Sequence, residues 1–180
     1  MREEVSSLAH AKPAPKLPPA RLARLPVTDI TLSSPAILSA RGAQSTIPRQ
    51  YTCDGANHWP TLHWSALPAD TAELALFVIN VKPVDNKLFF DWAVAGLSPK
   101  LDGIQTGQLP AEAIQGRNGY GDTGYTICPE GPNAESYVFA LYALPKSLNP
   151  HPGFNPTTLR EQALETARHS GLLIGTYKRT

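Results

Sequence analysis

Three apolar runs, each nine or ten residues long, constrain the fold of this 180-residue chain more than any other feature. They are ELALFVINV (73–81), LFFDWAVAGL (88–97) and SYVFALYAL (136–144). Runs that are apolar at nearly every position, and rich in β-branched and aromatic residues, are typical of strands buried on both faces. Because only a short loop, KPVDN (82–86), lies between the first two, we expect those strands to be neighbours.

The 18 prolines and 13 glycines argue against long helices. Proline removes a helical hydrogen bond and clashes with the preceding turn, and here it recurs too often for a helical bundle or coiled coil. The hydrophobic share of 42% is still large enough to bury a core. The composition therefore predicts one mainly β domain with many turns and loops.

Shorter segments complete the predicted domain. Short strands are indicated by composition at ITL (30–32), TIPRQYTC (46–53), LHW (62–64) and LLIGTYKR (172–179). The segment 101–131 contains seven glycines, so no regular element is expected there. A loop of this length in a compact domain is usually functional or poorly ordered.

One helix is predicted, within TTLREQALETARHSG (157–171). Thr157 or Thr158 is placed to cap its start, and Glu161 stands three residues after Thr158, as in a capping box. Gly171 is placed to close it.

The first 27 residues differ from the rest. They contain five prolines, five basic residues and two acidic ones, so their net charge is +3 and that of the remainder is −2. We predict a disordered Pro/Ala-rich linker or tail over 1–27 and a single domain over 28–180. No run reaches the roughly 18 apolar residues of a membrane span, and no signal core is present. A signal or anchor preceding residue 1 stays open.

Several function classes lack their sequence signals. A net charge of +1 predicts no attraction to nucleic acid, and no G-x-S-x-G, HExxH or P-loop motif occurs. His58 and His63 have no further ligands that the sequence places beside them, so they are interpreted as loop histidines. No metal or cofactor is predicted. Cys53 and Cys128, 75 residues apart, fit no compact zinc pattern and form either one disulfide or two free thiols.

The segment YTCDGANHWPTLHW (51–64) is the most specific motif. It places Trp59 and Trp64 on either side of Pro60, in a turn that either packs both rings into the core or forms the rim of a pocket. A second segment, GYGDTGY (119–125), sets two tyrosines among glycines, where backbone N–H groups can approach an anion.

In order along the chain, these motifs resemble the phosphatidylethanolamine-binding protein family, in particular its bacterial and archaeal Raf-kinase-inhibitor-like branch. The resemblance rests on 51–64, on LPADT (67–71), on GYTICPEGPNAESYVFALYAL (124–144) and on the closing LLIGTYKR, and it covers about residues 30–179. It implies a β-sandwich of two sheets with a few peripheral helices. It also implies a small pocket at one end that accepts phosphate-like groups.

The resemblance assigns residues to that pocket. The expected lining residues are Asp54, Asn57, Val81, Lys82, Asp91, Trp92, Tyr125, Ile127, Glu135 and Tyr137.

Several of them depart from the family pattern. Asp91 and Glu135 stand where the family has histidines, and Val81 stands where it has aspartate. Two carboxylates within about 5 Å of each other repel phosphate and either share a proton or attract a cation. Lys82 compensates only if its side chain turns inward. We therefore predict an altered or lost anion site.

Both cysteines lie in loops that border the family's pocket, and bacterial members with Cys in the first loop often carry one in the second. The resemblance therefore favours a disulfide between Cys53 and Cys128. A disulfide favours an extracytoplasmic location, whether periplasmic, secreted or anchored, while a cytoplasmic one stays open.

The leading functional hypothesis is a non-enzymatic binding or regulatory protein, because the family's members bind headgroups or nucleotides and some inhibit kinases or proteases. The alternative is a serine protease inhibitor that acts through the loop 116–124 or the tail. An enzyme using Asp91 and Glu135 as an acid–base pair is disfavoured, since no nucleophile or cofactor motif accompanies them. A small anionic or headgroup-like ligand, a protein partner and a homodimer all stay open.

Overall fold

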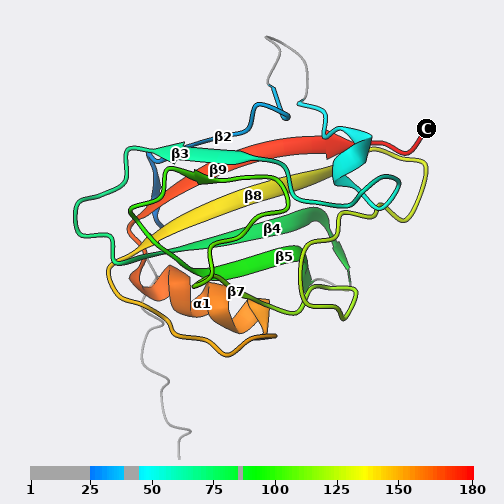
Figure 1. The fold of residues 1–180 in the computed structure, drawn as a ribbon. Helices are drawn as coiled ribbons and strands as arrows, with labels where there is room; N and C mark the ends of the chain where they lie inside the picture. The colour runs from blue at the N-terminus through cyan, green and yellow to red at the C-terminus, as the bar shows by residue number, and fades with distance from the viewer. Residues whose placement is uncertain (1–24, 39–44, 85–86) are drawn as a thin grey trace, which may run out of the picture.

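A computed structural model describes residues 25–38, 45–84 and 87–180 (Figure 1). Two β-sheets form the molecule: a six-stranded sheet of order β1-β9-β8-β4-β5-β7 and a three-stranded sheet of order β2-β3-β6. The strands are β1 (Val27–Thr28), β2 (Thr31–Ser33), β3 (Leu62–Ser65), β4 (Glu73–Val84), β5 (Lys87–Leu97), β6 (Gly103–Ile104), β7 (Ile114–Gln115), β8 (Glu135–Leu144) and β9 (His169–Tyr177). The predicted mainly β fold of two sheets is confirmed.

The three apolar runs form the centre of the larger sheet. Antiparallel β4 lies between β5 and β8, with Val78 opposite Trp92 on one side and Phe139 on the other. The predicted loop between the first two runs is shorter than expected, because β4 extends to Val84, which pairs with Lys87. The neighbouring positions of β4 and β5 confirm the expected hairpin.

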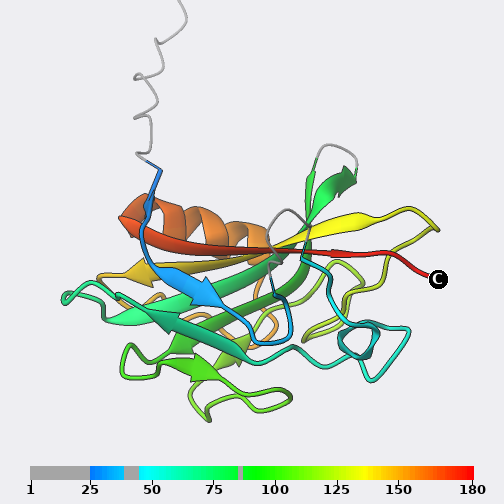
Figure 2. The ribbon, with the colours of Figure 1, turned by 90° about the horizontal axis from the view of Figure 1, so that it is seen from above.

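The larger sheet lies between the smaller sheet and the helix Pro156–Thr166, as Figure 2 shows, and hydrophobic side chains pack on both of its faces. On one face, Trp92 and Phe139 pack with residues of the smaller sheet such as Trp64. On the other face, Phe77 packs with Leu159 of helix α1 (Pro156–Thr166). Burial on both sides explains why the three runs lack the alternation of a half-exposed strand.

The predicted cap of the helix is wrong. Asn155 is the N-cap, and its Oδ1 accepts hydrogen bonds from the backbone N–H groups of Thr157 and Thr158 at 2.9 and 3.3 Å. Pro156 fits the first helical position, where no N–H is needed. The helix ends at Thr166, before the predicted Gly171, because β9 begins at His169 and pairs with β8.

Two further local predictions need correction. The segment 46–53 is not a strand: a 3-10 helix, Arg49–Tyr51, occupies it, and Thr46 makes one isolated bridge. Pro48 starts this turn, since its carbonyl accepts from Tyr51 N–H at 3.0 Å. The glycine-rich segment 101–131 is mainly irregular, as expected, but it contributes the two-residue strands β6 and β7.

Residues 1–24, most of the predicted tail, lie outside the described residues, and β1 begins at Val27 beside His169 of β9. No helix in the described ranges is both long and apolar enough to cross a membrane.

Candidate functional site

A small cavity lies at the end of the larger sheet where the β4–β5 hairpin, the start of β8 and the disulfide-bonded loop meet. Its volume is about 20 Å³, and its lining residues are Asn80, Lys82, Phe89, Tyr120, Cys128, Glu130 and Glu135. A space of this size holds about one water molecule. Lys82, Cys128 and Glu135 are thus the residues singled out from the sequence that line it.

Glu135 is the best-connected acid of the cavity. Its side chain is buried, and its Oε2 accepts hydrogen bonds from Asn80 Nδ2 at 2.7 Å and from the Tyr137 hydroxyl at 3.2 Å. Lys82 Nζ lies 3.9 Å from Glu135 Oε1, but the Lys82 side chain is 68% exposed. An ion pair with one partner in water contributes little, so Lys82 offsets only part of the negative charge.

Asp91 is fully buried on β5, where the pairing with β4 shifts register. Neither carboxylate oxygen has a hydrogen-bond partner of ordinary geometry among the described residues. Burial raises the pKa of Asp91 well above its usual value, and the nearby charge of Glu135 raises it further. Backbone N–H groups of Asn80 and of Asp91 itself act in the opposite direction, with a smaller effect than burial. Asp91 therefore keeps its proton at a pH where an exposed aspartate is ionised.

Three tyrosines share this environment. Burial first, and then the charge of Asp91, raises the pKa of Tyr120, Tyr125 and Tyr137. All three remain hydroxyl donors at neutral pH, and each hydroxyl has an acceptor. Tyr120 donates to the Cys128 carbonyl at 2.8 Å, and Tyr125 donates to the Tyr51 carbonyl at 2.7 Å.

Replacing Asp91 by asparagine is expected to stabilise the protein at neutral pH. The native Asp91 has a raised pKa, so the native state binds more protons than the unfolded state from about pH 3.9 upward, and stability falls as pH rises through that window. Asparagine carries no such dependence. The gain should be near zero at pH 3 and grow by about 1.4 kcal/mol for each pH unit between the unfolded and the native pKa of Asp91, because only the aspartate gives up its proton less readily in the native state.

Denaturant unfolding at several pH values measures this gain, with Asp70→Asn on an exposed aspartate as the matched control. A gain that is independent of pH, or a loss at pH 7, would contradict the raised pKa.

The three tryptophans belong to the core between the two sheets and do not line the cavity. Trp92 is fully buried; its ring centroid is 4.8 Å from that of Trp59, and its Nε1 donates to Gln115 Oε1 at 2.8 Å. Trp59, whose position in the 51–64 motif is serine in the family pattern, donates from Nε1 to the Gln105 carbonyl at 2.9 Å. Trp64 is buried in the core. The two rings of the 51–64 motif therefore pack inward, and Trp59 stacks there on Trp92.

Four other residues that the resemblance assigned to the pocket do not line this cavity. Val81 is 52% exposed, while Ile127 is fully buried. Asn57 adopts φ +55° and donates to Thr126 Oγ1 at 3.3 Å, which joins two loops. Asp54 faces the C-terminal strand instead of the cavity lining.

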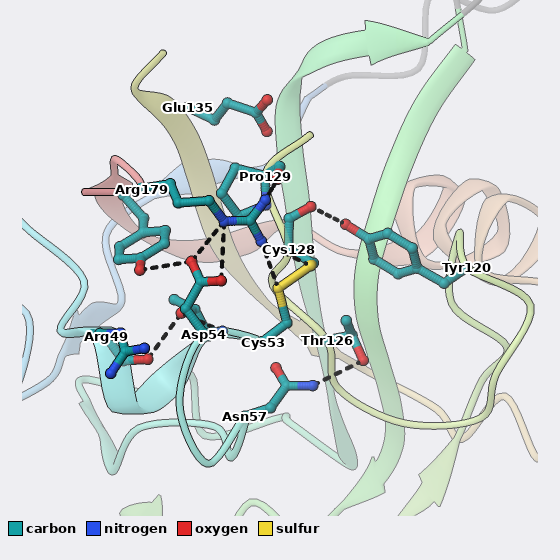
Figure 3. The surroundings of a disulfide bond; sticks show 12 residues. Arg49, Cys53, Asp54, Asn57, Tyr120, Thr126, Cys128, Pro129, Glu135 and Arg179 are labelled. Atoms are coloured by element: carbon teal, nitrogen blue, oxygen red, sulfur yellow. Dashed lines mark hydrogen bonds and ion pairs between the residues drawn. A yellow bond between two sulfur atoms is a disulfide. The ribbon is translucent and has the colours of Figure 1, made fainter. Parts of the chain in front are cut away.

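Cys53 and Cys128 form the expected disulfide, with Cα atoms 5.2 Å apart (Figure 3). Asp54 accepts from Arg179 Nε at 2.9 Å on both oxygens and from the Tyr177 hydroxyl at 2.9 Å. The hydrogen bonds from Arg179 are the largest cause of the lowered pKa of Asp54. Gly55 permits the tight turn here, because an added Cβ would lie 2.6 Å from the Arg49 carbonyl oxygen.

Sequence reasoning did not assign Asn80, Phe89, Tyr120 or Arg179 to this region. Asn80 carried a signal, as a polar residue in an otherwise apolar strand. Arg179 could also have been noticed, because it ends the closing motif, but the sequence does not show that its partners are Asp54 and the two cysteines. Within the described ranges, no three His, Cys, Asp or Glu side chains gather closely enough to hold a metal ion.

The protein is thus a scaffold of two packed β-sheets with a small polar cavity at one end, beside a disulfide. A family model described as phosphatidylethanolamine-binding protein matches residues 39–178. The chain belongs to the phosphatidylethanolamine-binding protein family. Membership supports a binding or regulatory role in the broad sense.

Relatives agree with this assignment. The Mycobacterium tuberculosis protein named "Putative lipoprotein LppC" is 36% identical over 151 residues, which are 83% of this chain and 72% of that protein. A "UPF0098 protein" of Methanothermobacter thermautotrophicus is 32% identical over 139 residues, 74% of this chain and 91% of that one.

Solved structures agree as well. CT736 of Chlamydia trachomatis has a TM-score of 0.73 at 27% identity and covers 84% of this chain and 98% of its own. YbcL of E. coli, described as a member of the mammalian PEBP family, has a TM-score of 0.72 at 21% identity, covering 85% and 100%. At that identity YbcL supports the fold alone.

Proposed function

We propose that this protein is a non-enzymatic binding protein that acts outside the cytoplasm, and that its end cavity accepts small neutral or cationic polar groups in place of phosphate-like anions. One observation carries the proposal: the buried, unpartnered carboxyl of Asp91 interacts electrostatically with Glu135, which lines the cavity.

An anion site needs cationic or N–H donors. At this cavity Glu135 supplies acceptor oxygens, and it already uses the amide of Asn80 and the hydroxyl of Tyr137 as donors. The remaining cation, Lys82, extends mainly into solvent. A phosphate entering here would meet carboxylate oxygens before donors, so the local charge disfavours it.

Size and burial favour binding over catalysis. A volume of about 20 Å³ admits a small group, such as an ammonium or hydroxyl end of a longer ligand, and leaves no room for a substrate and a reacting water together. Asp91 has no exposed surface, which removes it from direct proton exchange with a bound substrate.

The disulfide supports an extracytoplasmic location, since such bonds persist in oxidising compartments. The lipoprotein name of the mycobacterial relative is consistent with this proposal. The serine protease inhibitor alternative stays a prediction. Its candidate loop does include exposed residues, among them Arg117 and Tyr120.

Isothermal calorimetry with inorganic phosphate and phosphoethanolamine, with ethanolamine alongside, tests the proposed selectivity. We expect no saturable heat from either phosphate compound at millimolar concentration. Glu135→His, at the cavity lining, should weaken the exclusion of phosphate at pH 6, because it removes an acid and introduces a group that can carry positive charge.

The matched control is Glu161→His, which makes the same charge change at an exposed position away from the cavity. Millimolar or tighter phosphate binding by the unmodified protein, abolished by Tyr137→Phe, would overturn the proposal.

A further inference from the structure

The Cys53–Cys128 disulfide is in direct contact with a cation (Figure 3). Arg179 Nη2 lies 3.2 Å from Cys53 Sγ and 3.5 Å from Cys128 Sγ. The rest of the guanidinium is held in place: Nη1 donates to the Pro129 carbonyl at 2.9 Å, and Nε donates to Asp54. Arg179 is thus fixed with one nitrogen against both sulfur atoms.

A guanidinium in this position acts unequally on the two redox states. A disulfide carries no charge and is a weak acceptor, whereas a thiolate forms a strong charge-assisted hydrogen bond. A neighbouring arginine lowers the pKa of a cysteine thiol and makes its thiolate a better leaving group. The contact therefore stabilises the reduced pair relative to the disulfide.

The two loops stay adjacent without the sulfur–sulfur bond. Cys53 N–H donates to the Ile127 carbonyl at 2.9 Å, and the Tyr125 hydroxyl donates to the Tyr51 carbonyl at 2.7 Å. The side-chain amide of Asn57 also donates a hydrogen bond to Thr126, in the loop that carries Cys128. Reduction would leave two thiols held side by side, at a high effective concentration for closing again.

Both cysteines are also partly exposed, so an external thiol can approach them. Cys128 borders the cavity, and Cys53 has the shorter contact with Arg179. This asymmetry favours Cys128 Sγ as the atom attacked and Cys53 Sγ as the leaving group.

We propose that Cys53–Cys128 is a reversible thiol–disulfide exchange site for dithiol reductants, activated by Arg179. A thiolate of the dithiol attacks Cys128 Sγ, and the electron pair of the broken bond leaves on Cys53 Sγ as a thiolate beside the guanidinium. The second thiol of the reductant, once deprotonated, attacks its own sulfur in the mixed disulfide and releases Cys128. Two electrons and one proton pass from the dithiol to the protein, where Cys128 becomes a thiol and Cys53 stays a thiolate. The second proton goes to solvent, and the reductant leaves as a disulfide.

Equilibration of the full-length chain with mixtures of reduced and oxidised dithiothreitol tests this proposal, with free thiols counted by maleimide alkylation. Arg179→Gln should shift the exchange equilibrium about tenfold toward the disulfide, a change of about 30 mV, and should slow reduction. Asp54→Asn should shift it the other way, because it removes the negative charge that offsets Arg179. Lys178→Gln removes an exposed neighbouring charge without sulfur contact and should change nothing.

A second measurement distinguishes an effect of Arg179 on the reactivity of the cysteines from an effect of Arg179 on the stability of the fold. In Cys128→Ser the remaining Cys53 thiol should alkylate with a pKa below the ordinary value of about 8.5, and adding Arg179→Gln should raise that pKa. The proposal is overturned if Arg179→Gln changes neither the equilibrium nor the thiol pKa, or if Lys178→Gln changes them equally. Should Arg179→Gln fail to fold, an ordinary pKa of the Cys53 thiol in Cys128→Ser, which keeps Arg179, is the result that rejects it.

Discussion

Replacing both Cys53 and Cys128 by serine is expected to lower the free energy of unfolding by about 4 kcal/mol. The bond joins residues 75 apart in sequence, and a cross-link of that span removes much of the conformational freedom of the unfolded chain. Because hydrogen bonds also join the two loops, the native fold should persist. Guanidinium unfolding followed by circular dichroism measures the loss.

The reduced and alkylated natural sequence is the control for this experiment, and it should lose a similar amount of stability. A loss below about 1 kcal/mol in both would show that the unfolded chain gains little freedom when the bond is absent.

The Trp92→Ala variant is expected to lose about 3–5 kcal/mol, the range for removing a large aromatic side chain from a core. The ring has no exposed surface and stacks on Trp59, and the perpendicular Tyr125 ring lies with its centroid 5.5 Å away. Its removal would leave a cavity in the core beside Trp59 and Tyr125. Thermal and denaturant unfolding measure the loss.

A Trp92→Phe variant provides the comparison. It keeps an aromatic ring for the stack but loses the indole hydrogen bond to Gln115, so it should be clearly milder than alanine. Equal losses for the two variants would mean that the hydrogen bond, and not the packing of the ring, accounts for the effect.

Energetic costs concentrate at one end of the larger sheet. The unpartnered carboxyl of Asp91 is buried there, next to the acid Glu135. Natural proteins tend to break local rules of packing and pairing at functional sites and compensate for them elsewhere. Here the compensation includes the stacked tryptophans of the core and the cross-linked loops beside the cavity.

Much of the fold followed from the sequence. A strand that is buried on both faces is apolar at nearly every position, so the three apolar runs predicted the central strands β4, β5 and β8. Their short connection also predicted the hairpin of the first two. The disulfide and the candidate pocket were reached only through resemblance to a family, since no local pattern states which residues 75 apart will meet.

The local errors share one cause. Thr157 and Thr158 suit a helix cap as residue types, but the structure uses Asn155 because Pro156 already occupies the first turn. Residues 46–53 have strand-like composition, yet Pro48 and the disulfide loop favour a 3-10 turn. Several residue types satisfy each local signal, so the surrounding chain decides between them.

The sequence by itself determined the sheet-rich core, since burial on both faces imposes an apolar pattern that can be read without coordinates. Only the tertiary structure decided that Asp91 lies unpaired near Glu135 and that Arg179 contacts both sulfur atoms. Charge and hydrogen bonding act through distances of a few ångströms between side chains that are far apart in sequence. Folding alone sets those distances, and they determine the chemistry of this site.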